Sequence, residues 1–169
     1  ELTGWQRHTI AGTDAVVECT STIPSPDGAI DDVFLIVART IDGATVRYIE
    51  YIDHSWPLDG DMAEACYVDS AVTQTGAAST ITGLDHLEGE TVGVLADGTV
   101  HPDCVVSGGS ITLNGTYTTR TAGLKYRQRG RSVRIEAGAA DGTAQARTKR
   151  ISSVAFRVFN SLAFLFGTD

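Results

Sequence analysis

The sequence predicts an all-β protein in which both chain ends form an antiparallel β domain and a small β-barrel is inserted in the middle. Three observations lead to this prediction. Apolar residues come in short runs of strand length, several of which alternate with polar residues. Tight-turn pairs such as Asp42-Gly43, Asp97-Gly98 and Gly108-Gly109 separate these runs. No stretch carries a long helical pattern.

An antiparallel hairpin is predicted over Val33–Tyr51. Residues Val33–Arg39 are a continuous apolar run of strand length, Asp42-Gly43 is a typical two-residue turn, and Thr45–Tyr51 returns along the first strand. Apolar side chains fall on both alternating sets of the returning strand, so we expect both faces of the hairpin to be partly covered. An earlier strand is expected at Ala15–Thr20.

The composition changes at Cys66, and from there to about Thr121 the chain is small, β-branched and punctuated by glycines. Several short strands joined by tight turns suit a compact barrel or sandwich better than a flat sheet. Strands are expected at Cys66–Val72, Ser79–Thr82, Thr91–Ala96, Asp103–Val106 and Ser110–Leu113.

The elbow Leu84–Gly89 holds the most enzyme-like cluster of the chain, Asp85, His86 and Glu88. Side chains at these spacings on a turn rarely converge on one point. We therefore interpret the elbow as a single helical turn, with Asp85 accepting backbone N–H groups and Glu88 completing a capping box. Leu84 and Leu87 are then expected to point into the barrel. Metal binding or catalysis by this cluster is the alternative.

After Gly123 the chain becomes basic, and strands are expected at Ser132–Glu136 and Lys149–Phe159. The expected division is a discontinuous platform domain, residues 1–65 and 122–169, with the barrel inserted as residues 66–121. Chain ends that meet in one domain make such an insertion physically easy.

Charge is distributed unevenly along the chain. From Arg120 to Arg157 there are ten Lys or Arg against two acids, whereas the remainder holds three arginines against nineteen acids. Such a protein either pairs its halves across a subunit interface or exposes the basic part to a polyanion such as DNA. The candidate residues for either role are Arg120, Lys125, Arg127, Arg129 and Arg131.

Residue patterns for catalysis, metals and cofactors are missing. The four histidines have no metal-ligand spacing, no cysteine stands beside a histidine, and Cys19, Cys66 and Cys104 are expected to be buried free thiols. We therefore predict a protein that is not an enzyme and that uses no cofactor. No stretch is long enough to span a membrane. The aromatic residues Trp5 and Trp56 are candidate platforms for stacking a ligand.

The order of motifs resembles the tail nozzle, or tail tubular protein B-like, structural proteins of short-tailed bacteriophages. Residues Trp5–His8, Arg39–Gly43 and Arg47–Tyr51 carry the first part of the likeness. The run Gly83–Val92 is similar to a small barrel inserted in many of these proteins. Ala122–Tyr126 stands where the family commonly has a Gly-Leu-Pro-Tyr-like exit, with Lys125 replacing the proline. Thr148–Ser161 resembles a returning strand.

The resemblance implies a virion protein of the phage tail, made in the cytoplasm of the bacterial host. It implies a homo-hexameric ring that contacts other tail proteins, conducts DNA through its lumen and retains the packaged genome until ejection. It implies no catalytic residues. Family members are longer, so we expect this chain to be a piece of a longer polypeptide. A receptor- or carbohydrate-binding β module is the alternative function.

Overall fold

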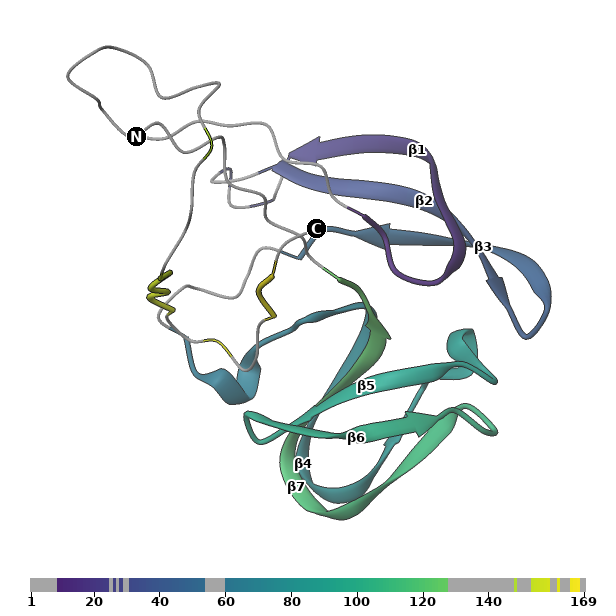
Figure 1. Ribbon diagram of the computed structural model, residues 1–169. Coiled ribbons are helices and arrows are strands. Elements are labelled where there is room, and N and C mark those ends of the chain that lie inside the picture. The colour runs from purple at the N-terminus through teal and green to yellow at the C-terminus, as the bar shows by residue number, and fades with distance from the viewer. Residues whose placement is uncertain are drawn as a thin grey trace. The chain divides into compact units, whose positions relative to one another are not determined.

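The computed structural model describes residues 9–24, 26, 28, 31–53, 60–127, 148, 153–158, 161 and 165–167. The chain divides into two compact units, Glu1–Arg127 and Gln128–Asp169. The described part of the first unit holds two antiparallel sheets and two short 3-10 turns, and no α-helix occurs in the ranges given above (Figure 1). The predicted all-β class is confirmed. In the same ranges no helix has the length and apolar character needed to cross a membrane.

The first sheet has three strands in the order β1 (Thr13–Pro24), β2 (Asp31–Ile41) and β3 (Ala44–Tyr51). The turn between β2 and β3 has positive φ angles at both central residues, +46° at Asp42 and +73° at Gly43. This is the type I′ geometry that matches the right-handed twist of paired strands. The predicted hairpin is confirmed.

The second sheet has four strands in the order β4-β7-β5-β6. Its strands are β4 (Val68–Thr82), β5 (Thr91–Ala96), β6 (Thr99–Val105) and β7 (Ser110–Lys125). The strand predicted at Thr91–Ala96 has its predicted bounds. A second left-handed Asp-Gly turn, at Asp97-Gly98, joins β5 to β6.

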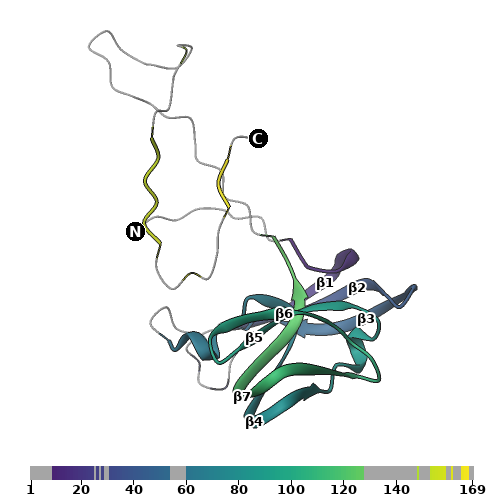
Figure 2. The same cartoon turned by 60° about the horizontal axis from the view of Figure 1, so that its bottom comes forward.

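The strands predicted at Cys66–Val72 and Ser79–Thr82 form one continuous strand, β4. A register shift against β7 lies between Thr75 and Ala78, and Gly76 there has a φ of +96°. An irregularity of this kind bends a strand without ending it. Strands β4 and β7 curve side by side in both views (Figures 1 and 2). Strands β4 and β6 are the edge strands of this sheet and are not paired with each other. The predicted closed barrel is therefore wrong for the described strands, which form an open, curved sheet.

Of the second unit, few residues are described. The strand predicted at Ser132–Glu136 lies outside the described residues. The strand predicted at Lys149–Phe159 is described only at residues 153–158, which have no assigned strand. The predicted platform domain built from both chain ends stays a prediction.

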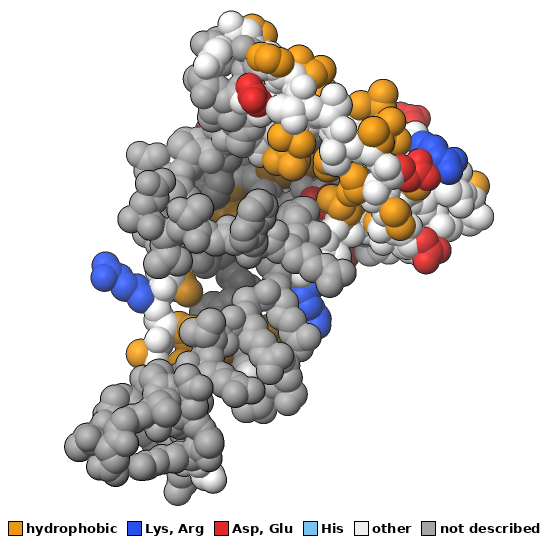
Figure 3. All heavy atoms as spheres, turned by 90° about the horizontal axis from the view of Figure 1, so that it is seen from above, with side chains coloured by type: hydrophobic (Ala, Val, Ile, Leu, Met, Phe, Trp, Pro, Cys, Tyr) orange, Lys and Arg blue, Asp and Glu red, His pale blue; other side chains and the backbone are white. Residues whose placement is uncertain are grey.

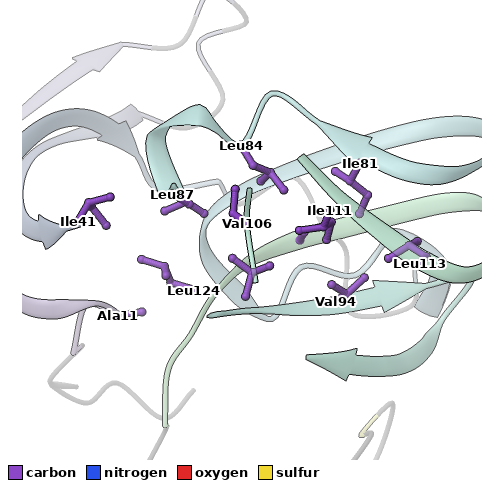
Figure 4. Packing of buried hydrophobic residues seen from close by; sticks show 12 residues of the cluster. Ala11, Ile41, Ile81, Leu84, Leu87, Val94, Val106, Ile111, Leu113 and Leu124 are labelled. Atoms are coloured by element: carbon purple, nitrogen blue, oxygen red, sulfur yellow. The ribbon is translucent and has the colours of Figure 1, made fainter. Parts of the chain in front are cut away.

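One apolar core joins the two sheets. Figure 4 shows side chains from the strands of the second sheet converging with Leu84 and Leu87 of the elbow. Both leucines are fully buried, as predicted. Ile41, at the end of β2, and Ala11, before β1, belong to the same cluster. The buried members are Ala11, Ile41, Ile81, Leu84, Leu87, Val92, Val94, Val106, Ile111, Leu113, Ala122 and Leu124.

A buried arginine connects the first sheet to its surroundings. Arg39, in β2, is 1% exposed, and its guanidinium donates to both carboxylate oxygens of Glu50 and, through Nε at 2.7 Å, to the carbonyl of Ala11. Glu50 also accepts from the Ser70 hydroxyl at 3.0 Å, and the Ala11 N–H donates to Asp69 at 2.7 Å. Since Asp69 and Ser70 belong to β4, this network links the two sheets.

The close approach of Arg39 explains the glycine at position 12. A Cβ there would lie 2.8 Å from Cδ of Arg39 and 3.3 Å from Cδ1 of Leu124. The φ of +108° at Gly12 is a backbone conformation that L side chains rarely adopt. Both constraints restrict this position to glycine.

Replacing Arg39 is expected to destabilise the protein strongly. Arg39→Met leaves the Glu50 carboxylate without its cation and should lower the free energy of unfolding by about 3 to 5 kcal/mol. Arg39→Met combined with Glu50→Leu should recover part of that loss, because no buried charge remains. Urea unfolding of both variants measures the effect.

The control for this experiment is Arg47→Met, which removes an exposed ion pair and should change stability little. An Arg39→Met variant as stable as Arg47→Met would contradict the structural role given to Arg39.

Candidate functional site

The candidate functional site is the face of the three-stranded sheet that points away from the core, called the outer face below. Directly paired residues of antiparallel strands share a face, and Ile36 is paired with both Cys19 and Ile49. Val37, the next residue on β2, is fully buried, so Ile36 points the other way. The apolar side chains of the outer face include Val16, Cys19, Ile23, Phe34, Ile36, Ile49 and Tyr51.

These side chains are exposed to an unusual degree. Ile49 is 77% exposed, Tyr51 60%, Val16 57% and Ile36 37%. Single exposed apolar residues are ordinary, but a contiguous group from three neighbouring strands is typical of an interaction site. Figure 3 shows hydrophobic side chains lying among acidic ones on the described part of that view.

The prediction that both faces of the hairpin are partly covered is wrong for the outer face of β3, although Ala38 on the outer face of β2 is only 7% exposed. On β3, Val46 and Tyr48 pack against the core, whereas Ile49 and Tyr51 point to solvent. The alternation of β3 was visible in the sequence. Contacts with the rest of the core decide which of the two apolar sets is buried. The sequence pattern does not contain these contacts.

An ion pair borders the outer face. Arg47 donates to Glu18 through Nε at 2.8 Å and Nη2 at 3.0 Å. These hydrogen bonds are the main cause that lowers the pKa of Glu18 and raises that of Arg47. Arg47 lies on the outer face because its partner on β2 is Ala38, which is also paired with Val16. An apolar centre with a charged border is the usual anatomy of a protein interface.

The three predicted basic residues that the structure describes have different surroundings. Arg120 is buried, Arg127 is exposed, and Lys125 is exposed and forms an ion pair with Asp103. Arg129 and Arg131 lie outside the described residues. The described arginines and lysine therefore do not form one basic surface.

Arg120 is an unusual buried cation. It is 3% exposed on β7, and its Nε and Nη1 are buried with no hydrogen-bond partner. Its charge is a minor contribution to the lowered pKa of Asp97, after the N–H groups of Thr119 and Thr118. A guanidinium that is buried in this way cannot reach the phosphate groups of DNA. Arg120 therefore does not fit the predicted DNA-facing role in this conformation.

The described cysteine nearest to a histidine is Cys104, whose Sγ lies 3.8 Å from Nδ1 of His101. Nε2 of His101 accepts from the backbone N–H of Asn114 at 3.1 Å, which assigns the ring proton to Nδ1, facing the Pro102 carbonyl at 2.7 Å. The imidazole is thus held by the backbone. Partial burial and Asp103 raise the pKa of the Cys104 thiol, so it is protonated at neutral pH. The pair lacks the features of an activated nucleophile.

The predicted location of the thiols is wrong for two of the three. Cys19 and Cys66 are exposed and Cys104 is half-buried, although all three are free as predicted. The apolar runs beside them were read as core, but Cys19 belongs to the outer face. The sequence pattern of a strand does not reveal which of its faces is covered.

The elbow is a turn, as predicted, but its capping is different. A 3-10 turn spans Asp85–Leu87, its N-cap is Leu84, and no side chain caps it. The carboxylate of Glu88 instead accepts from the N–H groups of Gly108 at 2.9 Å and Gly109 at 2.8 Å. Its partners are distant in the sequence, so the short-range capping pattern did not identify them.

His86 and Asp85 take part in packing around the same turn. Nε2 of His86 lies 3.1 Å from the Ser70 carbonyl, and its ring meets the edge of Tyr48. A Cβ at Gly109 would lie 2.4 Å from Oδ1 of Asp85, so the turn needs a glycine there. In the described part of the chain, no three His, Cys, Asp or Glu side chains are arranged to hold a metal ion.

The candidate stacking residues Trp5 and Trp56 lie outside the described residues. Their role stays a prediction. Comparison with known proteins identifies no relative: no protein-family model matches the chain, and no curated protein matches it either.

Glu88→Gln is expected to lower the melting temperature at neutral pH. The two glycine N–H groups lower the pKa of Glu88. A carboxyl group whose pKa is lower in the folded state stabilises the fold above its unfolded pKa, and this contribution is lost as pH falls through the folded pKa. The difference in melting temperature between wild type and variant should therefore shrink as the pH is lowered towards about 3.

Calorimetry at several pH values measures this difference. Glu90→Gln is the control, because within the described residues only the backbone of Glu90 takes part in the hydrogen bonds of the elbow. A difference for Glu88→Gln that is the same at every pH would contradict the role assigned to its charge.

Proposed function

We propose that the chain is a structural subunit of a phage tail nozzle or tube that works through subunit contacts. The observation that carries this proposal is the exposed apolar surface of the outer face, where Ile49 is 77% exposed. The ion pair of Arg47 and Glu18 lies at its border. A protein whose role is assembly needs such a surface, because burial of apolar area drives association.

The charge distribution also supports assembly. The first unit holds 18 acidic and 6 basic side chains, for a net charge of −12. The second unit holds 7 basic and 3 acidic side chains, for a net charge of +4. Opposite charges on two parts of one chain favour pairing between neighbouring copies.

The remaining parts of the proposal come from the sequence resemblance. They are a hexameric ring in the virion, contacts with other tail proteins, a lumen that conducts and retains DNA, and synthesis in the bacterial cytoplasm. The platform domain of both chain ends is part of the same proposal, with residues 66–121 as an inserted module whose described strands form an open sheet and no closed barrel. Its support is the pairing of β4, β5, β6 and β7 into a separate sheet.

Assembly is expected to weaken with salt. The purified chain should form a defined oligomer whose mass, measured by light scattering, decreases between about 0.05 and 0.5 M salt, because screening acts on exposed charges. Negative-stain electron microscopy should show closed rings. Monomers at all concentrations, or chains without a defined stoichiometry, would count against the proposal.

Arg129→Glu should weaken assembly at low salt if the basic part of one copy pairs with the acidic part of the next. Thr116→Glu, at an exposed position on β7 outside the basic segment, is the control. Both variants are compared with wild type by sedimentation velocity. Rings that are insensitive both to salt and to Arg129→Glu would remove the electrostatic part of the proposal.

A further inference from the structure

We propose that the outer face of one copy binds residues 153–158 of a second copy, so that the subunits associate head to tail. This inference rests on the proposed assembly function and names the two surfaces that meet. The first surface is the outer face of β1, β2 and β3. The second is the segment Ser-Val-Ala-Phe-Arg-Val at residues 153–158, called the donor segment below.

The donor segment has the pattern of a strand with one apolar face. Val154 is 58% exposed, Phe156 51% and Val158 53%, and the residues between them are Ala155 and Arg157. Side chains two residues apart point to the same side of an extended chain, so the three apolar side chains can form one stripe. Phe156 also packs on Phe166, with ring centroids 5.2 Å apart.

The outer face presents the matching apolar surface. Ile36 and Ile49 are paired across β2 and β3, and Val16 and Tyr51 extend the patch along the sheet. The outer face, within the first unit, and the donor segment, within the second, each present exposed apolar side chains. Each therefore has apolar area that association can bury, at roughly 25 cal/mol for each Å² removed from water.

Charge determines which surfaces meet. The described residues between 9 and 53 include seven acids and two arginines, and the arginines are already paired with Glu50 and Glu18. Two outer faces placed against each other would bring two of these acidic segments together, which disfavours a symmetric face-to-face dimer. The donor segment carries Arg157 and belongs to the basic second unit, so it is the complementary partner.

A contact between two different surfaces has a consequence for symmetry. Each copy then offers one donor segment and one outer face, so the association can repeat from copy to copy. Such heterologous contacts form a ring when the rotation closes and a filament when it does not. The closed ring of the proposed function requires a contact of this type.

The first test is the oligomeric state of the full chain, measured by sedimentation velocity over a concentration series. Ile49→Asp places a charge in the outer face and should raise the Kd of self-association at least about tenfold. Val100→Asp is the matched control, because Val100 is 61% exposed on β6, away from the outer face. Circular dichroism confirms that both variants fold.

The donor segment is tested in the same way. Val154→Asp should weaken self-association to the same extent as Ile49→Asp, and the two changes together should cost little more than either alone, because they remove the same contact. Leu165→Asp is the matched control, since Leu165 is 90% exposed in the second unit but lies outside the donor segment.

Disulfide crosslinking identifies which copy supplies the donor segment. One copy keeps Cys19 on the outer face and carries Cys66→Ser and Cys104→Ser. A second copy with a different tag has all three native cysteines replaced by serine and carries Val154→Cys. Mixed under mild oxidation, the two copies should form a disulfide-linked heterodimer. Leu165→Cys in place of Val154→Cys should crosslink much less.

The outcomes separate the two proposals. A wild-type chain that stays monomeric overturns the assembly function and this inference together. An oligomer that Ile49→Asp and Val154→Asp leave intact overturns only the inference. A chain that carries both Cys19 and Val154→Cys, with Cys66→Ser and Cys104→Ser, gives the last outcome. A disulfide that forms within this chain at high dilution, and not between the mixed copies, also overturns only the inference.

Discussion

The buried contact between Arg39 and Glu50 is the interaction on which the arrangement of the two sheets depends. It lies on the inner face of the β2–β3 hairpin, and its hydrogen bonds reach the segment before β1 and the start of β4. Burying a guanidinium is costly unless its donors are hydrogen-bonded, so the hydrogen bonds of Arg39 favour one arrangement of these segments. The glycine at position 12 leaves the space that the arginine needs.

This contact also decides which face of the hairpin is available for binding. With Arg39, Val37 and Tyr48 turned towards the core, the alternate residues of the same strands must point outwards. Those residues include Ile36 and Ile49, which a monomer would be expected to cover. The core covers one apolar face of the sheet, and the proposed assembly would use the other.

Several polar side chains of the second sheet and its turns hold the backbone in place. Glu88 binds the Gly108-Gly109 turn, Asp97 accepts from the backbone of Thr118 and Thr119, and His101 is held between two backbone groups. The lowered pKa values of Glu88 and Asp97 arise from these N–H groups. These shifts are the mark of structural hydrogen bonds, and they make both carboxylates weaker bases.

The sequence by itself determined the all-β class, the hairpin with its Asp42-Gly43 turn and the bounds of β5, because alternation and turn chemistry are local properties. It also showed the separation of charge between the two parts of the chain. Only the tertiary structure decided that β4 continues through Gly76, that Glu88 reaches Gly108, and that Ile49 and not Tyr48 faces solvent. Each of these depends on contacts between residues far apart in the chain, which a local pattern does not contain.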